Sequence, residues 1–557
     1  MMLKNKASDN QPDTVLEIPK EIGSITLVNG NDTVALCDVN NLKIAMGMDD
    51  SPLLPAGQIG AIVKIKVNKG FVYATVRELV RHDVRTEDSI GPVKHIMMYL
   101  DYLGQGLRAP YAPTGVSFDR GITDFPVPGQ LVYEVSYDDL EAIFGDNDTN
   151  HFHIGTVFPQ HMTPASIKTD SMLGKHFAVL GSTGTGKSCT VALLIHRIVE
   201  RMPKGHIIIL DPHDEYASAF KDCGKHFDIS NLRLPYWMMN FEEHVEMFIG
   251  RTDSAEREVE VDILRRCIYA ARVDAATSLQ SEKITVNSPI PYKLSFILEF
   301  LDNSMGKLDN PDSLASFMRV KAKVEELRRD VRFAFMFSGM LAHDNLKDVI
   351  KNLLRFPVED KPVSTIDLSG VPSEIVNVVV SMISRLVFDF AVWTKGDNSR
   401  PILLVCEEAH RYVPNSENTV FVSARKSIER IAKEGRKYGV SLGLVSQRPA
   451  DVSESALSQC GTIFAMRMNN ERDQSFVEHV MPEGSKGTLA ALSSLQNREA
   501  LVVGEGVRAP VRVLLDKLDE NKRPSGGNPS YSEDWQKEIE DDSFIVDTIE
   551  NWRNQGR

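Results

Sequence analysis

The chain has 557 residues, which is too long for one hydrophobic core and predicts three or four domains at roughly 100 to 200 residues each. Its hydrophobic content of 42% and charged content of 25% are those of an ordinary globular protein. The formal net charge of -14 argues against a protein that is coated in basic surface and binds DNA or anionic lipid from outside, so any contact with nucleic acid must be local.

Cysteine usage and the apolar segments favour a cytoplasmic protein that does not enter a membrane. The six cysteines are scattered without a C-x-x-C pair, which is typical of a reducing compartment and excludes a zinc ribbon or a disulfide frame. The first residues, "MMLKNKASDNQPD", are polar and are not expected to form a signal peptide. The longest apolar stretch, residues 371–393, contains Glu374, Arg385 and Asp389, so we expect a core helix there and not a membrane span.

The N-terminal part of the chain predicts a small β-barrel. Residues 1–13 are polar and are expected to be disordered. Short β-type runs such as "TVALCDV", "GAIVKIKV" and "FVYATVREL" follow, separated by Gly and Asn turns. We place the barrel at residues 14–105. A linking segment, with a strand-like centre and a short helix after it, is placed at 106–170.

The middle of the chain alternates apolar runs with helical segments. This alternation predicts a parallel α/β sheet covered by helices on both faces. We place this core at residues 171–240 and 360–515. The runs expected to form buried strands lie at 176–181, 206–210, 402–406, 440–446, 462–467 and 500–505.

Two further segments are predicted to be helical. Residues 241–359 show apolar residues at helical spacing and are interpreted as a helical bundle inserted into the α/β core. Residues 516–557 begin with a linker and end in an acidic helix. Its apolar side chains are expected to share one face: Trp535, Ile539, Phe544, Ile545, Ile549 and Trp552.

The stretch "FAVLGSTGTGKSCT" contains the pattern G-x-x-x-x-G-K-[ST] between an apolar strand and a helix. In this pattern backbone N–H groups and the positive end of the helix surround the nucleotide phosphates. Lys187 is expected to contact the γ-phosphate of ATP and Ser188 to bind Mg²⁺. A fortuitous glycine turn is the alternative. The residues predicted to bind the nucleotide are Gly181, Ser182, Thr183, Gly184, Thr185, Gly186, Lys187, Ser188 and Cys189.

Two carboxylates directly follow the apolar strand in "ILLVCEEAH". ATP hydrolysis needs one acidic group on the magnesium side of the nucleotide and a second group that orients the attacking water. We assign the magnesium position to Glu407 and the water-orienting position to Glu408. The alternative is a solvated acidic turn.

Two more strand ends contain polar side chains. Asp211 follows "IIIL" and is a candidate for positioning water or metal, because ligands bind at the carboxyl ends of parallel strands. Its alternative is a cap of the next helix. Gln447 follows the strand "VSLGLVS" and is a candidate sensor of the γ-phosphate, with structural capping as its alternative.

The segment "SARKSIERIAKEGRKYG" contains six basic residues in an acidic protein. Its simplest interpretation is a solvated basic face. Because it leads into the "VSQ" strand, we favour a subunit edge that presents an arginine to the ATP of a neighbouring copy. Arg436 is the first candidate and Arg430 the second.

Taken together, these motifs resemble the HerA group within the HerA/FtsK class of hexameric motor ATPases. The resemblance covers most of the chain and rests on "LGKHFAVLGSTGTGKS", "ILDPHDEY", "LLVCEEAHRYVP", "IAKEGRKYGVSLGLVSQRPADVS" and "ALVVGEGVRAPVRV". It implies a P-loop NTPase of RecA-like fold with an N-terminal barrel. It also implies a homohexameric ring that moves double-stranded DNA with ATP and Mg²⁺.

The resemblance also implies residue roles and partners. The barrel is expected to dock a partner nuclease of the NurA type, or another effector such as an NAD hydrolase in antiphage defence. The matching positions are Lys187 and Ser188 for nucleotide and magnesium, Asp211 and Glu408 for catalysis, Gln447 as sensor and Arg436 as the arginine that acts on a neighbour.

The sequence departs from the family pattern at two positions. Glu407 stands where the family has an aspartate, and Asp214 replaces a small residue in "DPHDEY". Both changes are expected to alter the rate of hydrolysis and to leave nucleotide binding intact.

Our leading hypothesis is an ATP-driven double-stranded DNA translocase or helicase that acts with an effector in DNA end processing or antiphage defence. The pore of its ring would need only a few basic residues per subunit, and "MRMNNERDQ" is one candidate segment. The alternative is a nucleotide-dependent scaffold that organises an effector with little DNA movement. A conjugative or septal DNA pump is a weaker third possibility. The sequence does not decide between a sixfold and a sevenfold ring.

Overall fold

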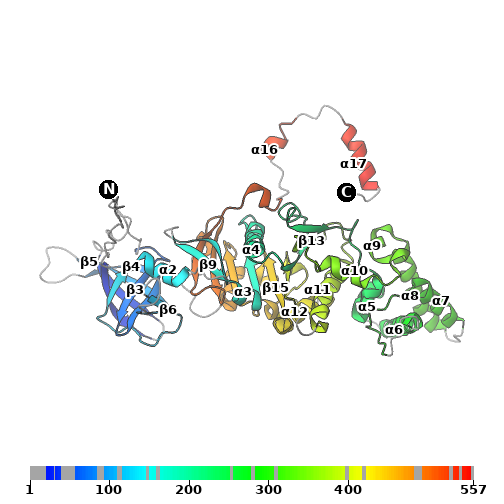
Figure 1. Ribbon diagram of the computed structural model, residues 1–557, viewed down its shortest axis with the longest axis horizontal. Coiled ribbons are helices and arrows are strands. Elements are labelled where there is room, and N and C mark those ends of the chain that lie inside the picture. Colours follow the sequence, from blue (N-terminus) through cyan, green and yellow to red (C-terminus); the bar gives the residue numbers. More distant parts are fainter. Residues whose placement is uncertain are drawn as a thin grey trace, which may run out of the picture. The chain divides into compact units, whose positions relative to one another are not determined.

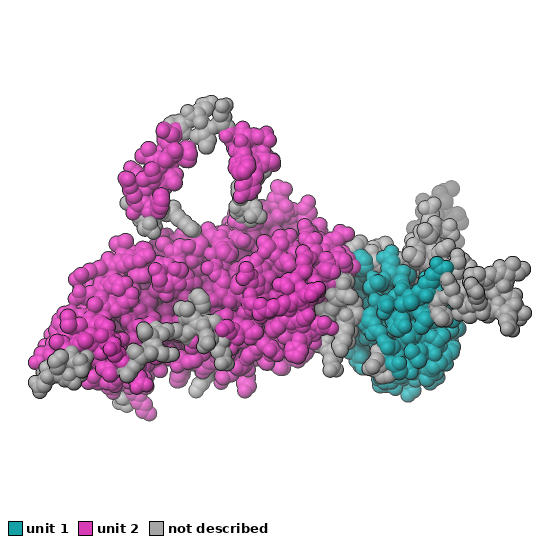
Figure 2. Space-filling model, turned by 180° about the vertical axis from the view of Figure 1, so that it is seen from behind, with its two compact units in different colours: residues 1–146, 157–164, 484–488 teal, residues 147–156, 165–483, 489–557 magenta. Residues whose placement is uncertain are grey.

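The protein is described by a computed structural model, in which the chain forms two compact units (Figure 2). Unit 1 consists of residues 1–146, 157–164 and 484–488, and unit 2 consists of the remainder. The expected disorder of residues 1–13 lies outside the described residues. The structure describes residues 20–29, 32–38, 57–84, 93–108, 116–145, 150–158, 163–250, 255–276, 283–306, 311–394, 400–416, 422–481, 492–525, 531–537 and 542–553.

Unit 1 is a closed antiparallel barrel (Figure 1). The sheet order is β2-β1-β7-β3-β4-β5-β6, and a further pairing of β2 with β5 closes six of the seven strands into a ring. Alternating side chains such as Ile25, Val63 and Val76 point inward and form its core. The strands are β1 (Glu21–Val28), β2 (Thr33–Asp38), β3 (Ile62–Val67), β4 (Gly70–Val84), β5 (Val93–Arg108), β6 (Val116–Asp119) and β7 (Leu131–Glu134).

The barrel extends beyond residue 105, where we placed its end. Strand β7 pairs with β1 on one side and with β3 on the other, so residues 131–134 are needed to close the ring. Helix α2 (Tyr137–Phe144) follows at once and begins with a capping box between Ser136 and Asp139. Part of the segment predicted as a link between domains therefore belongs to the barrel.

Unit 2 is built on an eleven-stranded sheet of order β12-β13-β11-β14-β15-β10-β16-β17-β18-β8-β9. The seven strands from β12 to β16 in this order are parallel. The strands are β8 (His151–Val157), β9 (Pro164–Lys168), β10 (Phe177–Leu180), β11 (His206–Asp211), β12 (Gly224–Phe227), β13 (Val363–Asp367), β14 (Ile402–Cys406), β15 (Val440–Ser446), β16 (Thr462–Met466), β17 (Glu499–Gly504) and β18 (Val511–Leu515).

Helices cover both faces of this sheet. The helices around the sheet are α3 (Thr169–Gly174), α4 (Lys187–Arg201), α11 (Val376–Trp393), α12 (Val422–Glu434), α13 (Glu454–Leu457) and α14 (Glu471–Val480). Figure 1 shows α4 on one side and α11 and α12 on the other. Ala178 and Leu180, two alternate residues of β10, belong to the same hydrophobic cluster as residues of α11 and α12, so they lie on the face that these two helices cover. The parallel α/β core and the N-terminal barrel confirm the predicted fold class.

One predicted strand direction is wrong. We expected residues 500–505 to form a parallel strand, but β17 runs antiparallel to β16 and to β18. Its apolar side chains are all buried, as expected for an inner strand. Burial on both faces explains the continuous apolar run, and that pattern does not depend on strand direction.

Helix α11 is an inner helix of unit 2. Among the described helices it is the one that is long and apolar enough to cross a membrane, yet 67% of that window is buried inside the protein. Arg385 of this helix pairs with Glu243 at 3.0 Å and with Asp389 at 3.2 Å. The expected core helix is therefore present.

The helical insertion lies between β12 and β13. Helices α6, α7 and α8 contact one another, while α5 contacts α11 and α12 of the core. Arg272 of α6 is fully buried and donates to the carbonyls of Trp237 and Met239 at 3.0 and 2.9 Å. The helices of this segment are α5 (Phe241–Phe248), α6 (Ala255–Ala276), α7 (Leu294–Met305), α8 (Pro311–Arg329), α9 (Ala334–Phe337) and α10 (Leu346–Leu353).

The C-terminal segment forms two separate helices, α16 (Tyr531–Asp534) and α17 (Ser543–Arg553), where we expected one. Ile539 lies outside the described residues. Trp535 follows α16 and is not part of α17, so it does not share a helical face with the apolar residues of α17. The predicted single apolar face is therefore divided between two segments.

Candidate nucleotide-binding site

The predicted phosphate loop connects β10 to α4 at the carboxyl edge of the parallel strands. Gly184 and Gly186 have φ of 77° and 98°, in the left-handed region that favours glycine. Gly186 is also the N-cap of α4, and no side chain caps this end. The first N–H groups of α4 and the positive end of its dipole therefore face the loop, which is an arrangement that suits a phosphate.

Lys187 is the first residue of α4 and is 8% exposed. Its Nζ donates to the carbonyl oxygen of Ser182 at 3.0 Å. Burial lowers the pKa of Lys187, while the charges of Glu407, Glu408 and Glu215 raise it. The structure therefore brings the lysine of the loop and the predicted acidic pair into one electrostatic cluster.

Glu407 is buried, and its Oε2 has no hydrogen-bond partner among the residues that the structure describes. Burial raises the pKa of Glu407 well above its usual value, and the neighbouring Glu408 and Glu215 raise it further. Burial raises the pKa of Tyr216, the charge of Glu407 raises it further, and Ser188 lowers it, so both residues act on this tyrosine. An unsatisfied buried carboxylate oxygen fits a hard cation such as Mg²⁺, which would ionise Glu407 on binding.

The pKa of Glu408 is shifted in the opposite direction. Its Oε2 lies 3.1 Å from Nδ1 of His410. Burial by itself would raise its pKa, but His410 and Lys187 lower the pKa of Glu408 below its usual value. Glu408 is thus an ionised carboxylate beside the phosphate loop, as needed to orient a water molecule and accept its proton.

Asp211 makes the contacts of a turn cap. Its Oδ2 accepts from the backbone N–H of Tyr216 at 2.8 Å and its Oδ1 from that of His213 at 3.1 Å. Burial raises the pKa of Asp211 to about 6, although these two N–H groups lower it. Asp211 therefore holds the turn that contains Glu215; no described helix begins at this turn, and the catalytic role of Asp211 stays a prediction.

Gln447 reaches the phosphate loop directly. Its Oε1 accepts a hydrogen bond from the hydroxyl of Thr183. Ser446, the last residue of β15, has its Oγ 3.2 Å from Nδ1 of His410. The end of β15 therefore contacts both the loop and the group that holds Glu408, so a change at the γ-phosphate could be transmitted along this strand.

Arg436 lies at the amino ends of the parallel strands, whereas the phosphate loop lies at their carboxyl ends. It belongs to the short 3₁₀ turn at Gly435–Tyr438, directly before β15, and it is exposed. Arg436 is close to His176, the residue before β10. Burial lowers the pKa of His176, and the charge of Arg436 lowers it further. The seven residues of β15 separate Arg436 from Gln447 by about 23 Å, at ~3.3 Å per residue. Arg436 therefore does not reach the phosphate loop of its own chain.

Sequence reasoning did not single out three residues of this cluster: Glu215, Tyr216 and His410. The carboxylate of Glu215 affects the pKa of Lys187 and Glu407. The signal for Glu215 was the acidic run in "DPHDEY", and that for His410 was its place two residues after Glu408. In both cases only the folded turn shows which side chain faces the loop.

The chain is similar to proteins of known families. The profile described as "Helicase HerA, central domain" matches residues 152–387. The "DNA double-strand break repair helicase HerA" of Pyrococcus furiosus is 27% identical over 448 residues, which are 73% of this chain and 76% of that protein. The protein of the same name from Sulfolobus acidocaldarius is 26% identical, with coverage of 77% and 80%.

Among solved structures, VirB4 of Thermoanaerobacter pseudethanolicus matches 68% of this chain and 99% of that chain, with 15% identity and a TM-score of 0.48. The family profile and the relatives agree with one another and match the part of the chain that contains the phosphate loop. Over most of its length the chain is therefore similar to the HerA helicases, and the HerA central-domain profile matches residues 152–387.

Proposed function

We propose that the chain hydrolyses ATP and uses the energy to move double-stranded DNA through a ring of six copies. The observation that supports this most directly is the carboxylate of Glu408, 3.1 Å from Nδ1 of His410 and with its pKa lowered by His410 and Lys187, because binding alone would not need a water-orienting carboxylate. The relatives are named as helicases of DNA double-strand break repair, which supports DNA as the substrate.

In this proposal each group of the cluster has one role. Lys187 contacts the γ-phosphate, Ser188 and Glu407 bind Mg²⁺, and Glu408 orients the attacking water. The magnesium ion supplies positive charge to the phosphate oxygens. Gln447 reports on the γ-phosphate through its contact with Thr183.

Movement of DNA needs a link between the nucleotide and a segment that contacts DNA. The segment 466–474, our candidate for the pore, provides such a link, because the N–H of Ser182 donates to the carbonyl of Arg467 at 2.9 Å. Asn470 then caps α14 through the N–H of Arg472. Nonspecific phosphate contacts by the basic residues here, repeated around a ring, would hold a duplex although the chain is acidic overall.

The test is ATPase activity with and without duplex DNA, together with displacement of a triplex-forming strand from that duplex. We expect stimulation by DNA and ATP-dependent displacement in the wild type, and neither in Lys187→Ala. ATP hydrolysis without stimulation or displacement would contradict the translocase and favour the scaffold that organises an effector. Particle mass would separately show whether the ring has six or seven copies.

The effector is proposed to dock on unit 1. This unit has a hydrophobic core of its own, so it can present a stable surface to a partner while unit 2 works as the motor. The resemblance favours a NurA-like nuclease or an NAD-hydrolase effector in the cytoplasm. Purification of the full chain with the product of the neighbouring gene would test this, and substitutions on the surface of the barrel should then break the complex without changing ATP hydrolysis.

A further inference from the structure

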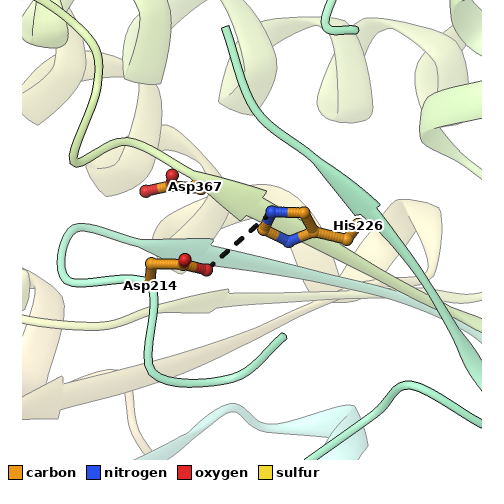
Figure 3. A group of neighbouring side chains, drawn as sticks. All are labelled: Asp214, His226 and Asp367. Atoms are coloured by element: carbon orange, nitrogen blue, oxygen red, sulfur yellow. Dashed lines mark ion pairs between the residues drawn. The ribbon is translucent and has the colours of Figure 1, made fainter. Parts of the chain in front are cut away.

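Three potential metal ligands meet at the edge of the sheet in unit 2: Asp214, His226 and Asp367 (Figure 3). Asp214 follows β11, His226 lies in β12, and Asp367 ends β13. One ligand atom of each residue lies within 4.8 Å of the others. We propose that these residues form a binding site for one divalent transition-metal ion, separate from the magnesium position assigned to Ser188 and Glu407.

The position of His226 is set by strand pairing. His226 lies opposite Thr365 in the parallel pair of β12 and β13, and its Nδ1 is 3.2 Å from the hydroxyl of Thr365. If Nδ1–H donates to this hydroxyl, the lone pair of Nε2 points to Asp214. Histidine ligands of metals commonly have one ring nitrogen held in this way by a neighbouring group.

The ligand atoms of His226 and Asp214 would have to move slightly closer together to bind one ion. Nε2 of His226 and Oδ1 of Asp214 are 3.9 Å apart, too far for a direct hydrogen bond. Two bonds of ~2.1 Å to one tetrahedral ion would place these atoms about 3.4 Å apart, so a shift of ~0.5 Å is sufficient. Asp214 lies within the turn that Asp211 holds, and its side chain is 44% exposed, so rotation of this side chain allows such a shift.

The third ligand is already oriented. Oδ1 of Asp367 accepts from the N–H of Ser369 at 2.7 Å, and Asp367 points from the same strand face as Thr365. One imidazole and two carboxylates suit Zn²⁺ or Mn²⁺, with water completing the coordination on the exposed side. Mg²⁺ suits this set less well, because it rarely takes an imidazole ligand.

The site lies apart from the phosphate loop but is connected to it. Strands β13 and β10 are four positions apart in the sheet, or about 19 Å at ~4.8 Å per strand. However, the charge of Asp214 is one of those that raise the pKa of Asp211, after burial and the charge of Glu215. A bound ion would therefore join the edge strand β12 to the turn that Asp211 holds.

The experiment uses the full chain without nucleotide, after treatment with a chelator. Calorimetric titration with Mn²⁺ and with Zn²⁺ gives affinity and stoichiometry, and the thermal midpoint is measured in parallel. We expect one tight ion per chain and a higher midpoint with the ion bound. Asp214→Asn and His226→Gln should each weaken binding by roughly tenfold or more.

Two control variants make the result specific. His479→Gln changes an exposed histidine that lies 3.5 Å from Glu454, and it should bind the ion as the wild type does. Glu407→Gln should also retain the ion, because this residue belongs to the nucleotide site. Absence of tight binding by the wild type would overturn the proposal. So would unchanged binding in both Asp214→Asn and His226→Gln, or loss of the ion in Glu407→Gln alone.

Discussion

Glu407 and Glu408 are adjacent in sequence and have opposite electrostatic environments. Glu407 is held in the protein interior with an unpaired oxygen, so its protonated form is favoured until a cation arrives. Glu408 lies between His410 and Lys187 and stays ionised. Two carboxyl groups with separated pKa values can take different roles at one pH, as in other acid–base sites.

This difference predicts different effects of removing each charge. Glu408→Gln should reduce kcat by about 100-fold or more, because the amide does not accept a proton from water, while ATP still binds. Glu407→Gln should mainly raise the Mg²⁺ concentration needed for half-maximal activity. The measurements are steady-state ATPase rates across a magnesium series and binding of a fluorescent nucleotide. A Glu408→Gln protein with wild-type kcat would contradict the assignment.

The pKa of Asp211 predicts an acid limit of activity. Burial raises this pKa to about 6, so the carboxylate that accepts the N–H groups of Tyr216 and His213 becomes protonated as the pH falls below this value. The turn is then held less firmly, and ATPase activity should decline below about pH 6. Asp211→Asn should have a lower rate at pH 7.5 without this decline. If the activity of Asp211→Asn still declined below about pH 6, the decline would be caused by another group.

Helix α2 is joined to the barrel by a buried ion pair. Nζ of Lys64 in β3 lies 2.5 Å from Oδ2 of Asp139, and the hydroxyl of Tyr73 in β4 donates to Oδ1 at 2.6 Å. Burial alone would raise the pKa of Asp139, but Lys64 and Tyr73 lower it below 3.8. The charged form of Asp139 is therefore preferred in the folded state.

Asp139→Ala should destabilise unit 1 by about 3 to 5 kcal/mol, because it leaves the charge of Lys64 buried without a partner. The contribution of the pair is fully present above pH 3.8 and is lost as the pH falls through the lower folded-state pKa. Thermal unfolding of the full chain between pH 3 and 7 would show the difference from wild type shrinking toward acid. Asp138→Ala, at the exposed neighbouring position, is the control and should change stability little.

The sequence predicted elements with strong local patterns and did not predict those defined by their neighbours. Strand β10 and the loop after it were predictable because strand, glycines and helix agree along one short stretch. Strands β12 and β13 have only four and five residues and contain polar side chains, so their apolar signal is weak. For β17 the apolar run indicated burial without indicating direction. Likewise, the approach of Glu215 to Lys187 depends on the folded turn at Asp211.

For the whole molecule, the main constraint is the separation of Arg436 from the nucleotide site. The phosphate loop lies at the carboxyl edge of the parallel strands, whereas Arg436 precedes β15 at the amino edge. One copy therefore contains both a phosphate loop and an exposed arginine, but the arginine does not reach the phosphate loop of the same copy. If Arg436 acts in hydrolysis, it acts on the nucleotide of another copy, and closed rings of identical subunits provide that contact.

Mixing two inactive variants tests this contact. Lys187→Ala lacks the lysine of the phosphate loop, and Arg436→Ala lacks the arginine. Each variant alone should therefore lose ATPase activity, and the rate of Arg436→Ala should fall by roughly 1000-fold. In mixed rings an intact phosphate site of the Arg436→Ala copy meets an intact arginine of the Lys187→Ala copy. With equal amounts and random assembly, about a quarter of the interfaces are complete, so about a quarter of the wild-type rate should return if interfaces act independently. Lys437→Ala, which changes the next exposed basic residue, should keep wild-type activity. A mixture that is no more active than its components would show that Arg436 does not complete a neighbour's site.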